Sequence, residues 1–159
     1  MSESQLQSMA HIAQQFCNLV EEVEQAPREQ WVQRMAVVLP RLHAAVAALD
    51  GTETETQLLP STDLETRFEL FSRLRALLGE YDGYWLEFDK VGDERCKSGS
   101  LADDFTDIYF DLKSGLAVLE QHPADAARAL ALWKASYKRH WGQHVVDASR
   151  QLYSLTSRQ

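Results

Sequence analysis

The sequence predicts an all-α protein, a single-domain antiparallel bundle of about five helices. Its 159 residues include only 7 glycines and 4 prolines. Turns that need these residues are therefore scarce, and the elements between the turns are long. Apolar residues recur every three or four positions, which is the period of a helix face, and no strand-like alternation is apparent. The length suits one domain with a core of its own.

The apolar period and the candidate helix ends divide the chain into five predicted helices. They cover about residues 4–25, 28–49, 62–78, 100–121 and 124–155. Pro27 separates the first two, because the residue before a proline avoids the helical conformation. Pro40 lies inside the second helix, where the period continues past it, so we expect a kink rather than an end. Gly142 weakens the middle of the fifth helix.

Two of these helices begin with residue pairs typical of a capping box. Thr62 precedes Glu65 by three residues, and Ser100 precedes Asp103 by three. The side chain of the first residue in such a pair accepts a hydrogen bond from a backbone N–H of the first helical turn. The third helix is then expected to bury an apolar stripe, formed by Leu64, Phe68, Phe71, Leu74 and Leu78.

An aromatic-rich, irregular loop is predicted between the third and fourth helices. Four aromatic side chains occur within eight residues: Tyr81, Tyr84, Trp85 and Phe88. This is more ring area than a protein leaves in water, so the loop is expected to fold back on the bundle. Tyr84 and Trp85 are therefore candidate ligand-binding residues.

Charge and cysteine content argue against several classes of partner and location. The net charge of −8 repels nucleic-acid phosphates and anionic lipids, so neither nucleic acid nor membrane is an expected partner. The two cysteines, Cys17 and Cys96, do not form a disulfide framework, and the first residues lack the pattern of a signal peptide. We expect a cytoplasmic protein with a protein or small-molecule partner, and a homodimer remains open.

Polar side chains at one-turn spacing border the predicted core on the fourth and fifth helices. On a helical wheel, one edge of the fourth helix carries a column of acids, formed by Asp104, Asp107 and Asp111. On the fifth helix, His144 falls in the middle of the apolar stripe, with His140 and Asp147 on its flank. An antiparallel hairpin of these helices would bring the acids and histidines together. Arg67 and Arg75 project close to the third helix's stripe and could face acids of a neighbouring helix.

Two interpretations of these acids and histidines remain open. Histidines four residues apart on a helix can bind one divalent metal ion, and carboxylates of a facing helix can complete the ligand set. The candidate ligands are Asp104, Asp111, His140 and His144. The alternative is a buried His–Asp hydrogen-bond network that fixes how the helices pack. The spacing matches no recognised signature, so no cofactor is predicted outright.

Two classes of function follow. The favoured class is a non-catalytic protein that acts by protein interaction or small-ligand binding, with the aromatic loop and a pocket between the last three helices. The alternative is a divalent-metal-dependent hydrolase that uses the Asp/His residues between helices four and five. The candidate site residues are Asp104, Asp107, Asp111, His140, His144, Asp147, Tyr84, Trp85, Arg67 and Arg75. The acids lack a known catalytic arrangement, which favours the first class slightly.

Three blocks lie between Tyr81 and Ala148: YDGYWLEFD, SLADDFTDIYFDLKSGL and HWGQHVVDA. Together these blocks resemble an uncharacterised all-helical bacterial family, domain of unknown function 5063. Members of that family often have proline where this chain has Gly83 and Lys90, so the aromatic loop departs from the pattern. The resemblance implies an all-α fold and a cytoplasmic bacterial protein, and it implies no activity.

Overall fold

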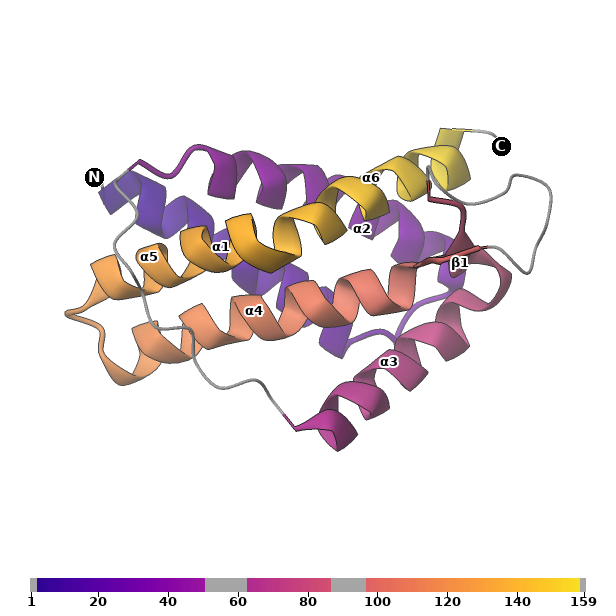
Figure 1. Ribbon diagram of the computed structural model, residues 1–159, viewed down its shortest axis with the longest axis horizontal. Coiled ribbons are helices and arrows are strands. Elements are labelled where there is room, and N and C mark those ends of the chain that lie inside the picture. Colours follow the sequence, from indigo (N-terminus) through magenta and orange to yellow (C-terminus); the bar gives the residue numbers. More distant parts are fainter. Residues whose placement is uncertain (1–2, 51–62, 87–96, 158–159) are drawn as a thin grey trace.

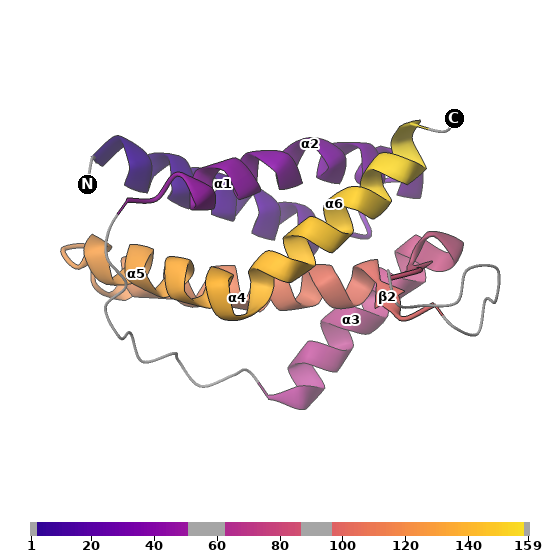
Figure 2. The same cartoon turned by 45° about the horizontal axis from the view of Figure 1, so that its top comes forward.

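The computed structural model describes residues 3–50, 63–86 and 97–157, and these form two layers of helices (Figure 1, Figure 2). The α-helices are α1 (Glu3–Glu21), α2 (Arg28–Ala47), α3 (Leu64–Leu78), α4 (Leu101–Gln121), α5 (Ala126–Ser136) and α6 (Gly142–Ser157). α1 packs against α2 in one layer, and α4 packs against α5 in the other. α6 crosses from the second layer to α2, whereas α3 packs on α4 and projects from the bundle.

The described residues confirm the predicted all-α fold of about five helices. α5, a five-residue π-helix (Tyr137–Trp141) and α6 follow one another without interruption, so they correspond to the single predicted last helix. α2 continues through Pro40, so this proline does not end the helix. None of the helices among the described residues is both long enough and apolar enough to cross a membrane.

The irregular connection between α3 and α4 contains a small clamp that the sequence did not predict. One 3₁₀ turn, η1 (Gly79–Tyr81), follows α3. Strand β1 (Gly83–Tyr84) then pairs antiparallel with β2 (Gly99–Ser100), which leads directly into α4. Tyr84 is buried, as expected of the aromatic loop, whereas Phe88 lies outside the described residues.

The core between the layers contains large aromatic side chains with satisfied polar atoms. Trp31 and Trp133 are fully buried, and their ring N–H groups donate to the backbone oxygens of Leu19 (2.8 Å) and Leu112 (3.1 Å). These bonds remove the cost of burying an unpaired indole N–H. The core therefore holds α4 and α5 at a defined distance.

The predicted buried stripe of α3 is wrong in its first half. Leu64 and Phe68 are 84% and 68% exposed, whereas Leu70, Leu74 and Leu78 are buried. α3 packs mainly against α4, so only one narrow face is covered, and that face is rotated from the predicted one. The helix begins after Asp63, whose Oδ1 accepts the Thr66 N–H at 2.9 Å, and the predicted cap Thr62 lies outside the described residues.

Candidate metal centre

The start of α4 is anchored by a residue from the loop before it. Ser100 is the N-cap, as predicted, and its hydroxyl accepts the Asp103 N–H at 3.2 Å. The same hydroxyl donates to Asp82, and Asp82 Oδ1 accepts the Ala102 N–H at 2.7 Å. A carboxylate at this position also suits the positive end of the helix dipole. Asp82 thus helps to fix the first turn of the helix that carries the acids.

Five side chains of α4 and of the last helix form an alternating Asp/His cluster, defined here as Asp104, Asp107, Asp111, His140 and His144. His144 Nδ1 lies 2.7 Å from Asp104 Oδ1, and His140 Nδ1 lies 2.7 Å from Asp111 Oδ2. The opposite nitrogens, His144 Nε2 and His140 Nε2, lie 3.1 and 3.6 Å from one atom, Asp107 Oδ2. Both imidazole rings therefore direct their Nε2 atoms toward the same carboxylate oxygen.

Two further predicted site residues contact the outer oxygens of the cluster. The hydroxyl of Tyr84, on β1, donates to Asp104 Oδ2. The guanidinium of Arg67, on α3, forms an ion pair with Asp107 Oδ1. Side chains from β1 and α3 thus hold the two aspartates whose remaining oxygens face His144.

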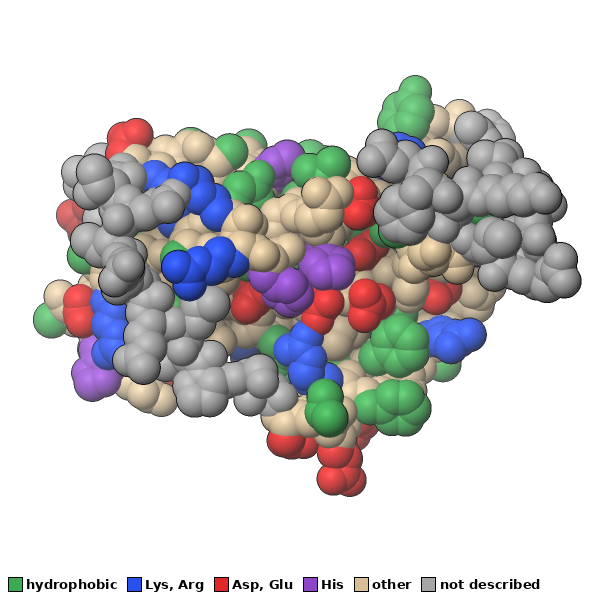
Figure 3. Space-filling model, in the orientation of Figure 1, with side chains coloured by type: hydrophobic (Ala, Val, Ile, Leu, Met, Phe, Trp, Pro, Cys, Tyr) green, Lys and Arg blue, Asp and Glu red, His purple; other side chains and the backbone are tan. Residues whose placement is uncertain are grey.

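The cluster lies at the edge of the core and meets solvent along one side. The side chain of Asp104 is 6% exposed, those of Asp107 and His144 are 15% and 22% exposed, and that of His140 is 46% exposed. Figure 3 shows histidines in the middle of this face, next to acidic side chains and above a group of hydrophobic ones. The cluster is therefore reachable from solvent on the His140 side.

His144 was predicted in the middle of the apolar stripe, but it lies at the edge of the core. The π-helix explains this difference. A π turn holds one more residue than an α turn, so everything after it is rotated relative to a regular helical wheel. Val145, which is fully buried, takes the central position, and His144 turns toward α4. The predicted unbroken helix over residues 124–155 is corrected accordingly.

Replacing Gly142 by alanine is expected to damage both the π turn and the cluster. The Gly142 N–H donates to the Tyr137 oxygen, and an added Cβ would lie only 2.6 Å from that oxygen. We expect the Gly142→Ala variant to lose about 1–3 kcal/mol of stability in urea unfolding. Gly83→Ala is the control, since a Cβ there meets Lys97 at an ordinary 3.7 Å. Equal stability of the two variants would contradict the prediction.

The charges of the cluster shift the pKa of its members. Burial alone would lower the pKa of His144, but its bonds to Asp104 and Asp107 outweigh burial and raise the pKa to about 10. Burial would raise the pKa of Asp107, yet its bond to His144 and the charge of Arg67 keep that pKa below its usual range. In the metal-free protein, His144 is therefore an imidazolium between two carboxylates at neutral pH.

Three predicted site residues lie outside the cluster. Asp147 accepts a hydrogen bond from Gln143 at 3.0 Å on the same helix. The backbone oxygen of Trp85 accepts a hydrogen bond from Arg150 at 2.7 Å, and Trp85 lines a separate hollow beside α6. Arg75 is exposed near the end of α3. Asp82 and Asp103, by contrast, were not among the predicted site residues.

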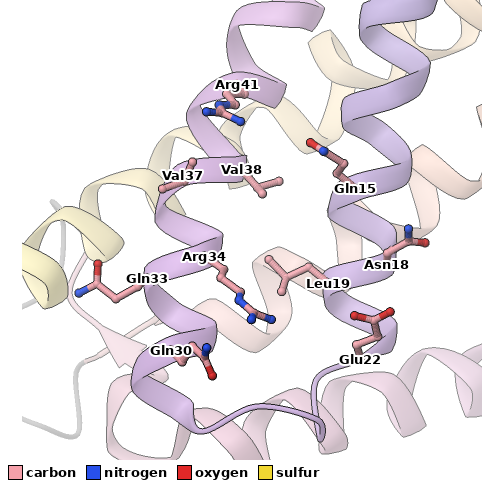
Figure 4. Close-up of a pocket in the computed structure, with 10 residues that line it drawn as sticks. All are labelled: Gln15, Asn18, Leu19, Glu22, Gln30, Gln33, Arg34, Val37, Val38 and Arg41. Atoms are coloured by element: carbon pink, nitrogen blue, oxygen red, sulfur yellow. The ribbon is translucent and has the colours of Figure 1, made fainter.

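Two further hollows are relevant to the choice of a ligand site, besides the one beside α6 that Tyr84 and Trp85 line. One, the α3–α4 hollow, adjoins the cluster and is lined by Leu64, Glu65, Arg67, Phe68, Phe71, Asp103, Thr106 and Asp107. The other lies between α1 and α2 and is lined mostly by amide and charged side chains, such as Gln15, Gln33 and Arg34 (Figure 4). The α1–α2 hollow contains none of the predicted site residues, whereas Asp107 belongs to both the cluster and the α3–α4 hollow.

The fold and the site define an all-helical domain with an Asp/His cluster between two helices. The chain belongs to the family described as domain of unknown function (DUF5063), whose model matches residues 2–158. It is similar in fold to the crystal structure of protein BF1032 from Bacteroides fragilis, with a TM-score of 0.80 and 24% sequence identity. That similarity covers 97% of this chain and 93% of the other. A search of curated proteins found no match.

Proposed function

We propose that this protein binds a divalent transition-metal ion through His140 Nε2, His144 Nε2 and Asp107 Oδ2. The convergence of both Nε2 atoms on one carboxylate oxygen carries the proposal. Nitrogen and oxygen ligands about 2.0–2.1 Å from a tetrahedral zinc ion lie about 3.3 Å from one another. The observed separations from Asp107 Oδ2, 3.1 and 3.6 Å, bracket that value. Imidazole and carboxylate together suit zinc and related ions.

The contacts of the two Nδ1 atoms also support His140 and His144 as metal ligands through Nε2. A histidine that binds a metal through one nitrogen usually donates its other N–H to a carboxylate, which fixes the tautomer and the ring orientation. Asp104 and Asp111 stand in this position, each 2.7 Å from an Nδ1 atom. A proton on Nδ1 leaves the Nε2 lone pair for the metal. Metal binding would therefore displace the Nε2 proton of His144, so affinity should rise with pH.

A second grouping, Asp103, Asp104 and His144, is less suited to a metal ion. Its ligand atoms also lie within 4.8 Å of one another. However, Asp104 is buried, and its two oxygens already accept hydrogen bonds from Tyr84 and His144. A metal bound to Asp104 Oδ1 and His144 Nδ1 would have to break the hydrogen bond between them, in a site with little access to solvent. The centre that includes Asp107 keeps those bonds.

Three protein ligands and an open side favour the metal-dependent hydrolase among the two predicted functions. A structural zinc site has four protein ligands, whereas a catalytic one keeps a position for water and lowers the pKa of that water to about 7. A metal held by Asp107, His140 and His144 would supply a water of lowered pKa for addition to a carbonyl carbon, and the bond from that carbon to the leaving group would then break. The leaving group takes up the proton that the water lost. Asp103 lines the hollow beside Asp107, and we propose it as the group that would carry that proton.

The non-catalytic function remains the second candidate, and one observation favours it. Leu64 and Phe68 present an exposed apolar surface on α3, which would suit a partner or small ligand without any reaction. For both candidates we propose a cytoplasmic location, which the low cysteine content supports. Turnover of a metal-loaded sample distinguishes them.

Zinc titration of the chelator-treated protein, followed by calorimetry, tests the proposal. We expect one zinc ion per chain, and an affinity about 10–100-fold lower in Asp104→Asn, because that change weakens the support of His144. Asp147→Asn is the matched control, since Asp147 accepts a hydrogen bond from Gln143 on its own helix and lies outside the cluster. The proposal fails if the wild type binds no zinc, or if Asp104→Asn and Asp147→Asn bind it equally well.

A further inference from the structure

The apolar surface of α3 forms a wall of the α3–α4 hollow, directly beside the proposed metal centre. Leu64 and Phe68 are 84% and 68% exposed, and Phe71 lies beside Phe68 with ring centroids 6.3 Å apart. The other side of the hollow includes Asp103 and Asp107. Large apolar side chains in water are unfavourable unless something covers them. Because these side chains line the same hollow as Asp107, a ligand bound at the metal centre could cover them.

The position of this wall is held by polar contacts at both of its edges. Asp63 caps the first turn of α3 through the Thr66 N–H. Arg67 binds Asp107, and its guanidinium lies 5.1 Å from the ring centroid of Phe110 on α4. Since Arg67 immediately precedes Phe68, these contacts fix the backbone of α3 at Phe68 relative to the centre. The helix that carries the wall is therefore in place before a ligand binds.

The charges around the hollow disfavour polyanionic ligands. A divalent ion and Arg67 would bring three positive charges, but the aspartates of residues 103–111 bring up to four negative ones. Glu65 adds another acid to the rim. A nucleotide or polyphosphate would find no excess of positive charge there. A neutral or singly charged ligand with an apolar group fits both the charge and the wall.

We propose that the α3–α4 hollow binds the apolar side group of the substrate, a neutral or singly charged carbonyl compound with an aromatic or branched aliphatic group. The carbonyl oxygen of such a molecule would bind at the metal, while its apolar group lies against Phe68 and Leu64. This inference rests on the proposed metal centre and adds the class of substrate. The hollow acts in recognition, and the cluster acts on the bond that is cleaved.

Two zinc-binding probes that differ only in their apolar group test the inference. Acetohydroxamate and benzohydroxamate bind zinc through the same pair of oxygens. With zinc-loaded wild type, we expect benzohydroxamate to bind about 10-fold more tightly than acetohydroxamate, since its ring is buried against Phe68. In Phe68→Ala, that preference should fall to about the value for free zinc. The ratio of the two affinities cancels any general change in metal binding.

Tyr153→Ala is the matched control, because Tyr153 is 71% exposed on α6 and is not among the residues that line this hollow. It should keep the wild-type preference for benzohydroxamate. Zinc titration of each variant is done first, so that a loss of metal binding is distinguished from a loss of ligand preference. An unchanged preference in Phe68→Ala with intact zinc binding overturns the substrate class alone. Absence of zinc binding by the wild type overturns both proposals.

Discussion

The His144→Ala variant is expected to unfold with a free energy about 2–4 kcal/mol below that of the wild type and to bind no zinc at micromolar concentrations. The change removes a ring that is mostly buried and leaves Asp104 and Asp107 without their shared partner. Urea unfolding in the presence of a chelator measures the first effect, and zinc titration measures the second. A stability loss below about 0.5 kcal/mol would contradict the burial of this ring.

The pH dependence of this stability difference gives an independent check. The folded protein raises the pKa of His144 to about 10, from an ordinary value of 6.5. The bound proton therefore stabilises the metal-free fold fully below pH 6.5, and this contribution disappears as the pH rises through 10. The difference between wild type and His144→Ala should be largest near pH 6 and should shrink toward pH 10. A difference that grows with pH would contradict the assigned partners.

Asp107→Asn is expected to reduce zinc affinity about 1,000-fold, more than the 10–100-fold typical of residues behind the ligands. The substitution keeps the shape of the side chain but removes the charge on the atom that both Nε2 atoms approach. It also removes the negative partner of Arg67, so a loss of about 1.5–3 kcal/mol in stability should accompany it.

Calorimetry on Asp107→Asn and Asp111→Asn distinguishes a ligand from a supporting residue. Asp111 bonds to the Nδ1 side of His140, so its replacement should weaken zinc binding less than that of Asp107. If both variants lose stability but neither changes zinc binding, the cluster is a hydrogen-bond network that fixes helix packing. If Asp111→Asn has the larger effect, the assigned ligand set is wrong.

The sequence could place the acids because α4 is a regular helix. A period of 3.6 residues puts Asp104, Asp107 and Asp111 on one flank, and the structure brings all three to the histidines. The same helical wheel put His144 in the middle of the apolar stripe, because it assumed a regular α-helix. A π turn adds one residue to the turn, and no residue pattern in this segment predicts it. The only local signal was Gly142, which tolerates the close approach of the Tyr137 oxygen.

Two other features depend on contacts that a helical period does not contain. The face of α3 that is buried is decided by its packing on α4, so Leu64 and Phe68 lie in solvent although they share an apolar stripe with buried residues. Asp82 binds the first turn of α4 across 20 residues of chain. No local pattern signals such a contact, because its partner is a backbone N–H group that every non-proline residue carries.

The β1–β2 clamp makes the connection before α4 a natural insertion point. Pairing of Gly83 with Ser100 and of Tyr84 with Gly99 holds the two ends of the intervening chain side by side. The entropy cost of closing a loop between fixed ends grows only with the logarithm of its length. A peptide tag or a small reporter domain could therefore be inserted between the two strands while α4 and its acids keep their place.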